Sequence, residues 1–290
     1  MTTAGHQLVP QQSERPHFAP LRLVTFFLLA YGFSWAWVIP WAATHRTVFQ
    51  GRGWPTHFPS LVGPLLAAVA VTAWTRGGLG VRDLLARMVR WRIGWRWWLI
   101  CLSPLAAFAV VLGFMAAAGL SIPPRSDFVR FSGLPSSWGV IGVVLAVLVI
   151  NGFGEETGWR GYALPQLQLR FAPLTATLIL AAVWAAWHVP QFFLLDSYKD
   201  FSLAMLPVFF LGLTCGAVVL TWLYNRTSSI LAVAIWHGLY NLTGATAAAT
   251  SGNGTISAAM WTFAVLLALV LLYLEWQAHR RGRPTILQPR

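Results

Sequence analysis

The charged residues of this chain of 290 residues divide it into long uncharged runs, and that spacing restricts the possible folds severely. A charged side chain at the centre of a bilayer costs several kcal/mol, and a helix needs roughly 20 residues to cross one. The uncharged runs cover residues 23–45, 53–75, 97–124, 131–154, 171–195, 201–225 and 227–274. The last run is long enough for two helices, near 229–248 and 257–276, because the turn sequence at 251–255 divides it. The sequence therefore predicts an all-α membrane bundle of about eight transmembrane helices.

The composition excludes an ordinary soluble domain. Hydrophobic residues make up 57% of the chain and charged residues only 10%, against roughly 25% in soluble domains. A net charge of +12 would suggest nucleic acid in a soluble protein. Here we interpret the cations as loops that face anionic lipids, so we expect membrane lipids and no nucleic acid as partners. We predict one transmembrane domain over 21–278, between a disordered polar tail at 1–20 and a basic tail at 279–290.

The distribution of basic residues predicts the orientation. If both termini are cytoplasmic, fifteen of the twenty Lys and Arg residues fall on the inner side and five on the outer side. This bias follows the positive-inside rule, so we expect a multi-pass protein of the plasma or inner membrane with both termini in the cytoplasm. The segment 79–96 carries five arginines among apolar residues and predicts a helix that lies in the inner headgroup layer.

Two adjacent carboxylates inside a predicted span are the first candidate functional residues. Glu155 and Glu156 follow 24 uncharged residues. Arg160 lies four residues after Glu156, so we expect these two side chains to form an ion pair on one helix face. Glu155 has no charged partner at helical spacing. If the helix continues to about residue 164, just before Pro165, Glu155 lies about 14 Å from its inner end and therefore within the hydrocarbon.

Two further spans carry polar pairs at similar depth. Trp184 and His188 lie one helical turn apart, and His237 and Asn241 repeat this spacing in a later span. The rise of the helix places these groups and Glu155 within a band of about 10 Å across the membrane. We therefore expect them to meet in one site. The other histidines lie in predicted tails or loops, and we expect no role for them: His6, His17, His45, His57 and His279.

The chemistry of this set is that of water attack on a carbonyl group. Glu155 suits a general base that takes a proton from water, and His188 suits its partner in proton transfer. His237 and Asn241 are two donors on one helix face, which is the arrangement that stabilises a developing oxyanion. Sequence motifs for a covalent serine or cysteine nucleophile are absent.

A metal site is the alternative use of the same residues. Glu155, His188 and His237 would supply three zinc ligands and leave one position for water, with Glu156 as the base. The usual H-E-x-x-H signature is absent from the sequence. We expect a metal-independent site, with zinc as the alternative.

Together these motifs resemble those of a known family. Glu155-Glu156-x-x-x-Arg160, the aromatic Trp184 four residues before His188, and His237-x-x-x-Asn241 occur in this order on separate predicted spans within about 140–245. The pattern resembles the CPBP (CAAX protease and bacteriocin-processing, or Abi) family of intramembrane proteases. This family includes type II CAAX prenyl endopeptidases, bacteriocin-processing proteins and bacteriocin-immunity proteins.

The resemblance implies an eight-span endopeptidase with a specific division of roles. In it, Glu155 and His188 activate water, while His237 and Asn241 form the oxyanion hole; Glu156, Arg160 and Trp184 support them. Trp184 stands where the family usually has Phe. The family motifs do not settle metal use, and many members carry the label metalloprotease.

Three functions remain open at this stage. The first is an intramembrane endopeptidase that cuts a membrane-associated peptide, a membrane protein or a CAAX-like protein. The second is a binding or immunity protein of the same fold that does not cut. The third is a proton-coupled transporter, because membrane Glu and His residues often carry protons.

Overall fold

Helices form almost all of the regular structure in the computed structural model, which describes residues 18–198, 202–251 and 254–289. Within these residues there is no strand, only two isolated bridges between loops. The predicted all-α, polytopic membrane bundle is therefore confirmed. Most of the predicted disordered tail, 1–20, lies outside the described residues.

Six helical stretches in the described chain are long and apolar enough to cross a membrane. They are α1 (Pro20–Ala43), α2 with α3 (Phe58–Leu61 and Gly63–Met88), the stretch Ser136–Gln168, α9 with η5 (Pro173–Trp187 and Val189–Phe193), α10 (Leu206–Thr227) and α13 (Thr255–Arg280). A seventh candidate is the pair α4 (Trp95–Cys101) and α5 (Ser103–Ala117), bent by 50°. The remaining predicted position, 229–248, contains α11 (Ile230–Gly244), whose 15 residues are too few for a full span.

The stretch Ser136–Gln168 is not a uniform α-helix. It consists of η2 (Ser136–Trp138), α6 (Gly139–Ala146), a π-helical segment η3 (Val147–Phe153), α7 (Gly154–Gly158), a second π-helical segment η4 (Trp159–Ala163) and α8 (Leu164–Gln168). Pro165 does not end the helix as expected, because it lies in the first turn of α8, where a missing N–H is tolerated. The π segments flank the two carboxylates of α7, and such segments occur often at functional sites.

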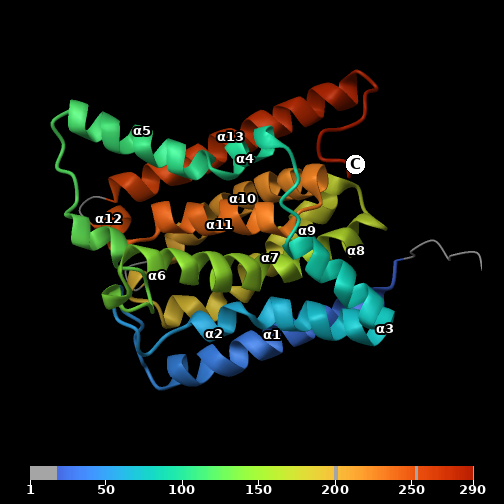
Figure 1. Cartoon of the computed structure of the whole chain (residues 1–290), viewed down its shortest axis with the longest axis horizontal. Coiled ribbons are helices and arrows are strands. Elements are labelled where there is room, and N and C mark those ends of the chain that lie inside the picture. Colours follow the sequence, from blue (N-terminus) through green and yellow to red (C-terminus); the bar gives the residue numbers. More distant parts are fainter. Residues whose placement is uncertain (1–17, 199–201, 252–253, 290) are drawn as a thin grey trace, which may run out of the picture.

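Close backbone contacts hold α7 at the centre of the bundle. A Cβ atom added to Gly152 would lie 2.5 Å from the carbonyl oxygen of Ala234 on α11, and one added to Gly158 would lie 2.6 Å from that of Pro64 on α3. Only glycine permits such an approach. Figure 1 shows the resulting layers, with α6 and α7 between α11 on one side and α2 and α3 on the other.

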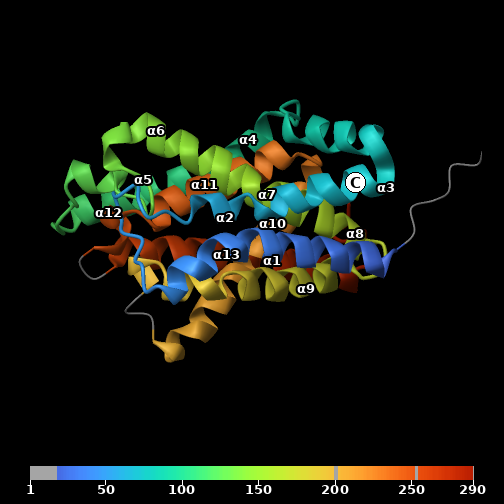
Figure 2. The ribbon, with the colours of Figure 1, turned by 90° about the horizontal axis from the view of Figure 1, so that it is seen from below.

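The arginine-rich segment differs from its prediction as one helix over 79–96. Gly77, with φ 59° and ψ −160°, breaks α3, which then ends at Met88. Residues 89–94 are not helical, and Gly94 has φ 88° immediately before α4 begins. A right-handed helix cannot continue through a residue in that conformation, so two helices replace the predicted one. Figure 2 shows the last part of α3 at the end of the bundle where it turns toward α4.

Both ends of the described chain lie at the same end of the bundle. α1 begins and α13 ends there, while α12 (Ala247–Thr250) and the start of α6 lie at the opposite end (Figure 1). The short η1 (Arg125–Val129), η6 (Asp196–Tyr198) and η7 (Leu203–Met205) connect helices in the remaining loops. The termini therefore share one side, and the prediction that this side is cytoplasmic remains a prediction.

Candidate active site

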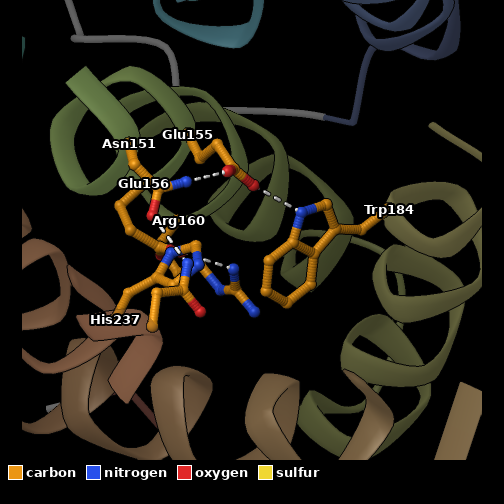
Figure 3. Close-up of polar contacts among 7 residues, drawn as sticks. Asn151, Glu155, Glu156, Arg160, Trp184 and His237 are labelled. Carbon is orange, nitrogen blue, oxygen red and sulfur yellow. Dashed lines mark hydrogen bonds and ion pairs between the residues drawn. The ribbon is translucent and has the colours of Figure 1, made fainter. Parts of the chain in front are cut away.

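The carboxylate of Glu155 is held by two neutral donors. Its side chain is buried on α7, and its Oε1 accepts a hydrogen bond of 2.6 Å from Nδ2 of Asn151, one helical turn earlier. Its Oε2 accepts a bond of 2.7 Å from the indole Nε1 of Trp184 on α9 (Figure 3). Within the described residues, the Glu155 carboxylate therefore has two neutral hydrogen-bond donors and no cation at hydrogen-bonding distance. Both oxygens have a partner that fixes the direction of the carboxylate.

Glu156 has the opposite environment, although it is the adjacent residue. Its Oε1 accepts hydrogen bonds of 2.9 Å from Arg160 Nη1 and 2.8 Å from His237 Nδ1 (Figure 3). The Glu156 and Arg160 side chains are completely buried, and the predicted ion pair between them is present. The contact to His237 was not predicted, because depth along the helix did not indicate which carboxylate this ring reaches. Glu156 is therefore an orienting group for two cationic or polar side chains.

Trp184 connects the residues of the site. Besides its bond to Glu155, its ring lies 5.7 Å from the ring of His188 and 5.4 Å from that of His237, measured between centroids. The guanidinium carbon of Arg160 lies 4.5 Å from its ring centroid, a cation–π contact. The sequence predicted only that Trp184 is an aromatic neighbour of His188. In the structure, four polar side chains contact Trp184.

His188 has a defined hydrogen-bonding state. It lies at the C-terminal cap of α9, and its Nδ1 is 2.8 Å from the carbonyl oxygen of Trp184. A carbonyl only accepts, so Nδ1 carries the proton, and in the neutral ring Nε2 is the acceptor. A direct contact between His188 and Glu155 is not among the interactions of the described residues, but both line the same cavity.

Asn241 reaches the site through Asn151. Its Nδ2 donates a hydrogen bond of 2.6 Å to Oδ1 of Asn151, which in turn donates to Glu155. Asn241 therefore belongs to the same network as the carboxylate, and one N–H of its amide is already used. We predicted no role for Asn151 from the sequence. The spacing of four residues between Asn151 and Glu155 is the signal that indicates their contact.

The four predicted catalytic residues line one cavity of about 440 Å³, namely Glu155, His188, His237 and Asn241. Its wall also includes Ser132, Ser197 and Thr250, which lie in or beside the loops at the end of the bundle opposite the termini. Much of the remaining wall is apolar or aromatic and includes Phe209, Leu213 and Trp236. The predicted convergence of these residues from three separate helical segments is therefore present in the structure.

His57 is a cavity residue that the sequence did not reveal. It immediately precedes α2, is only 5% exposed, and its Nδ1 is buried without a hydrogen-bond partner in the described chain. Burial and the neighbouring His188 lower the pKa of His57 to about 4, so its ring is neutral at pH 7. We expected no role for it because it lies in a loop, and no spacing in the sequence indicates the contact.

The residues of the site do not form a metal-binding cluster. Among the described residues, no group of three or more His, Cys, Asp or Glu side chains is arranged to hold a metal ion. Glu155 is bound by two neutral donors, and Nδ1 of His237 by Glu156. The alternative ligand set Glu155, His188 and His237 thus shares a cavity but does not fit a three-ligand zinc site in this arrangement.

Comparison with known proteins supports the resemblance seen in the motifs. Residues 137–243, which include Glu155, Glu156, Trp184, His188, His237 and Asn241, match the family described as "Type II CAAX prenyl endopeptidase Rce1-like". A protein of Methanococcus maripaludis named "CAAX prenyl protease 2" is 29% identical over 224 residues, which cover 73% of this chain and 79% of that protein. The likeness therefore extends over most of the chain.

Proposed function

The chain is similar to proteases of the CAAX prenyl endopeptidase type, and on this premise we propose that it is an intramembrane endopeptidase in which Glu155 activates the attacking water. One observation carries the proposal. Glu155 is a buried carboxylate oriented by two neutral donors, in a cavity shared with His188 and His237. The neighbouring Glu156 is bound by Arg160 and His237 and is therefore the weaker base of the two.

The first step is the addition of water to the carbonyl carbon of the scissile peptide bond. A water molecule beside Glu155 gives one proton to the carboxylate while its oxygen bonds to that carbon. The carbonyl π electrons move onto the oxygen, which becomes an oxyanion. His188 accepts a second hydrogen bond from the water at Nε2, because its Nδ1–H is held by the Trp184 carbonyl. These two contacts would fix the direction of attack.

The oxyanion needs donors, and His237 and Asn241 supply them in this proposal. Glu156 binds Nδ1 of His237 and stabilises a positive charge on that ring, so that Nε2–H can donate to the oxyanion. The amide of Asn241 has one N–H left after its bond to Asn151. In the second step the C–N bond breaks, and the leaving amine takes the proton that Glu155 received.

The proposed substrate is a membrane-associated peptide or protein with an apolar group near the cleaved bond. The cavity wall includes Phe209, Leu213 and Trp236, which suit an apolar chain rather than a charged one. The name of the relative adds a CAAX-like, prenylated terminus as the first substrate to test. No metal takes part in this proposal.

The test compares the wild type with Glu155→Gln on a prenylated CAAX peptide and on membrane peptides of producing cells. The variant keeps the size of the side chain and removes the base, and its single carbonyl oxygen accepts from one of the two donors, so we expect kcat/KM to fall about 10²–10⁴-fold. Glu275→Gln is the matched control, because Glu275 on α13 does not line the cavity. This variant should cleave the peptides at the wild-type rate. Cleavage that persists at the wild-type rate in Glu155→Gln would refute the proposal and favour a binding or transport role.

A further inference from the structure

A second cavity lies at the end of the bundle where α1 begins and α13 ends. It has a volume of about 430 Å³, and side chains of α1, α3, η4, α8 and α10 line it. They include Arg22 from α1, Arg76 and Arg87 from α3, Gln168 from α8 and Tyr224 from α10. The proposed peptide hydrolysis uses none of these residues.

The cavity has an excess of positive charge. Among the described residues that line it, three are arginines and one, Asp83, carries a carboxylate. Asp83 Oδ2 lies 3.1 Å from Arg87 Nη2 and 3.7 Å from Arg76 Nη1, so two of the arginines share one acid. Arg22 has no ion pair among the described residues. The charge of the lining is therefore suited to an anion.

Two buried donors of this cavity lack an acceptor in the described part of the protein. They are Nε of Arg87 and Nε2 of Gln168. The Arg87 guanidinium is already fixed, because Nη1 donates to the Gly161 carbonyl at 2.8 Å and to the Tyr224 hydroxyl at 2.6 Å. A buried donor without a partner is unfavourable, and a fixed donor is well prepared for a ligand. Both features indicate a missing acceptor.

The position of the cavity selects the kind of anion. α1 begins at Pro20, α8 ends at Gln168 and α10 ends at Thr227, so the lining lies where apolar helices end. That is the depth of the lipid headgroups if these helices cross the membrane. A phosphate offers several acceptor oxygens in different directions, which matches donors that come from several helices. We infer that this cavity binds the phosphate of an anionic phospholipid.

Occupancy of this site would act on the candidate active site through one segment. Arg87 holds the carbonyl of Gly161 in η4, the π-helical segment that also carries Arg160, the partner of Glu156. A bound phosphate would hold Arg87 and thus η4 in place. The inference does not depend on the proposed hydrolysis, because binding and stability can be measured without a substrate.

The experiment uses the full chain in micelles of an uncharged, phosphate-free maltoside detergent. Phosphatidylglycerol, phosphatidylcholine and inorganic phosphate are added separately, and the thermal unfolding midpoint and the lipid bound in native mass spectrometry are recorded. The variant is Arg22→Gln with Arg76→Gln, which leaves the structural bonds of Arg87 intact. The control is Arg82→Gln with Arg170→Gln, which also removes two charges from exposed residues at this end but not from the cavity lining.

We expect phosphatidylglycerol to raise the unfolding midpoint of the wild type and of the control pair. The cavity pair should bind it about 30-fold more weakly, since each arginine beside an anionic lipid contributes about fivefold. Equal weakening in both pairs would overturn the inference, because it would show a general charge effect. An equal response to phosphatidylcholine would also overturn it. If inorganic phosphate raises the unfolding midpoint as much as phosphatidylglycerol does, the lipid assignment is wrong and the ligand of the cavity is a soluble phosphate.

Discussion

Glu155 and Glu156 are neighbours in the chain, yet their partners give them different chemistry. The neutral donors Asn151 and Trp184 orient Glu155, whereas Arg160 and His237 neutralise and fix Glu156. A helix places consecutive side chains about 100° apart, so adjacent acids face different helices. This division explains how two adjacent glutamates can act as one base and one orienting group: their carboxylates face different partners, which limits the repulsion between them.

The role of the Trp184 indole can be separated from its bulk. Trp184→Phe keeps an aromatic ring against His188 and His237 but removes the hydrogen bond to Glu155. Loss of one bond to a charged group costs about 1.5–3 kcal/mol, so we expect kcat/KM to fall about 10- to 150-fold on a cleaved peptide. Trp187→Phe is the control, since Nε1 of the buried Trp187 has no partner in the described chain. An equal loss in both variants would show that ring size, not the bond, matters.

His57 predicts a pH dependence of stability. Its pKa is lowered to about 4 in the folded protein from 6.5, so below pH 6.5 the unfolded chain binds a proton that the folded protein does not. Stability should therefore fall as the pH drops from 6.5 to about 4, by up to about 3 kcal/mol from this residue, and level off below that. His57→Phe should lose less over this window in thermal unfolding scans. Parallel pH curves for the two proteins would contradict the predicted role of His57.

The choice between water activated by Glu155 and a zinc-bound water is tested by metal removal. The Glu155, His188 and His237 side chains do not form a three-ligand cluster in the described residues, so a chelator should leave peptide cleavage unchanged. Elemental analysis of the purified protein should find well below one zinc per chain. Stoichiometric zinc, together with activity that is lost on chelation and restored by zinc, would replace the proposed mechanism with a metal-dependent one.

At the residue scale, the sequence predicted contacts within a helix better than contacts between helices. The Glu156–Arg160 pair follows directly from a spacing of four residues. The contact of His237 with Glu156 spans 81 positions and depends on which face of α11 meets α7. His57 is more remote still, because a loop residue enters the cavity only through the packing of other elements. Spacing carries no information about such contacts.

At the scale of elements, the uncharged runs located the helices but not their internal geometry. Each of the eight predicted positions contains a helix, because burial in lipid requires apolar residues whatever the turn type. The π-helical segments η3 and η4 leave no mark in apolar sequence. Hydrophobicity alone also does not indicate the kink at Gly77 inside α3 or the break before α4, where Gly94 has a positive φ. Glycine was the available signal at both breaks.

The approach of η3 to α11 should be sensitive to a single methyl group. Gly152→Ala would place Cβ 2.5 Å from the Ala234 carbonyl oxygen, so α11 must move away and take His237 and Asn241 with it. We expect a loss of about 1–3 kcal/mol in stability and a lower kcat. Gly32→Ala on α1 has nothing within 4 Å of the added Cβ and should leave stability equal or slightly higher. Unfolding midpoints that match in the two variants would contradict this close packing.

At the scale of the whole molecule, the two cavities lie toward opposite ends of the bundle. The candidate active-site cavity includes loop residues at the end away from the termini, and the arginine-lined cavity lies at the end where α1 begins. The positive-inside bias predicts cytoplasmic termini, which puts the arginines in the leaflet that is rich in anionic lipid. The same orientation puts the loop residues of the active-site cavity, such as Ser132 and Ser197, toward the outer side.

Orientation therefore decides which substrates can reach Glu155, and thiol labelling in intact cells can determine it. Ser197→Cys, exposed beside the active-site cavity, and Arg283→Cys, near the C-terminus, are labelled with a membrane-impermeant reagent; the native Cys101 and Cys215 are buried. With cytoplasmic termini, only Ser197→Cys reacts before permeabilisation. The substrate would then have to be a peptide or protein segment exposed on the outer side. Reaction of Arg283→Cys alone would show the opposite orientation, with the loop residues of the active-site cavity on the cytoplasmic side. A protein lipidated in the cytoplasm could then reach the site directly.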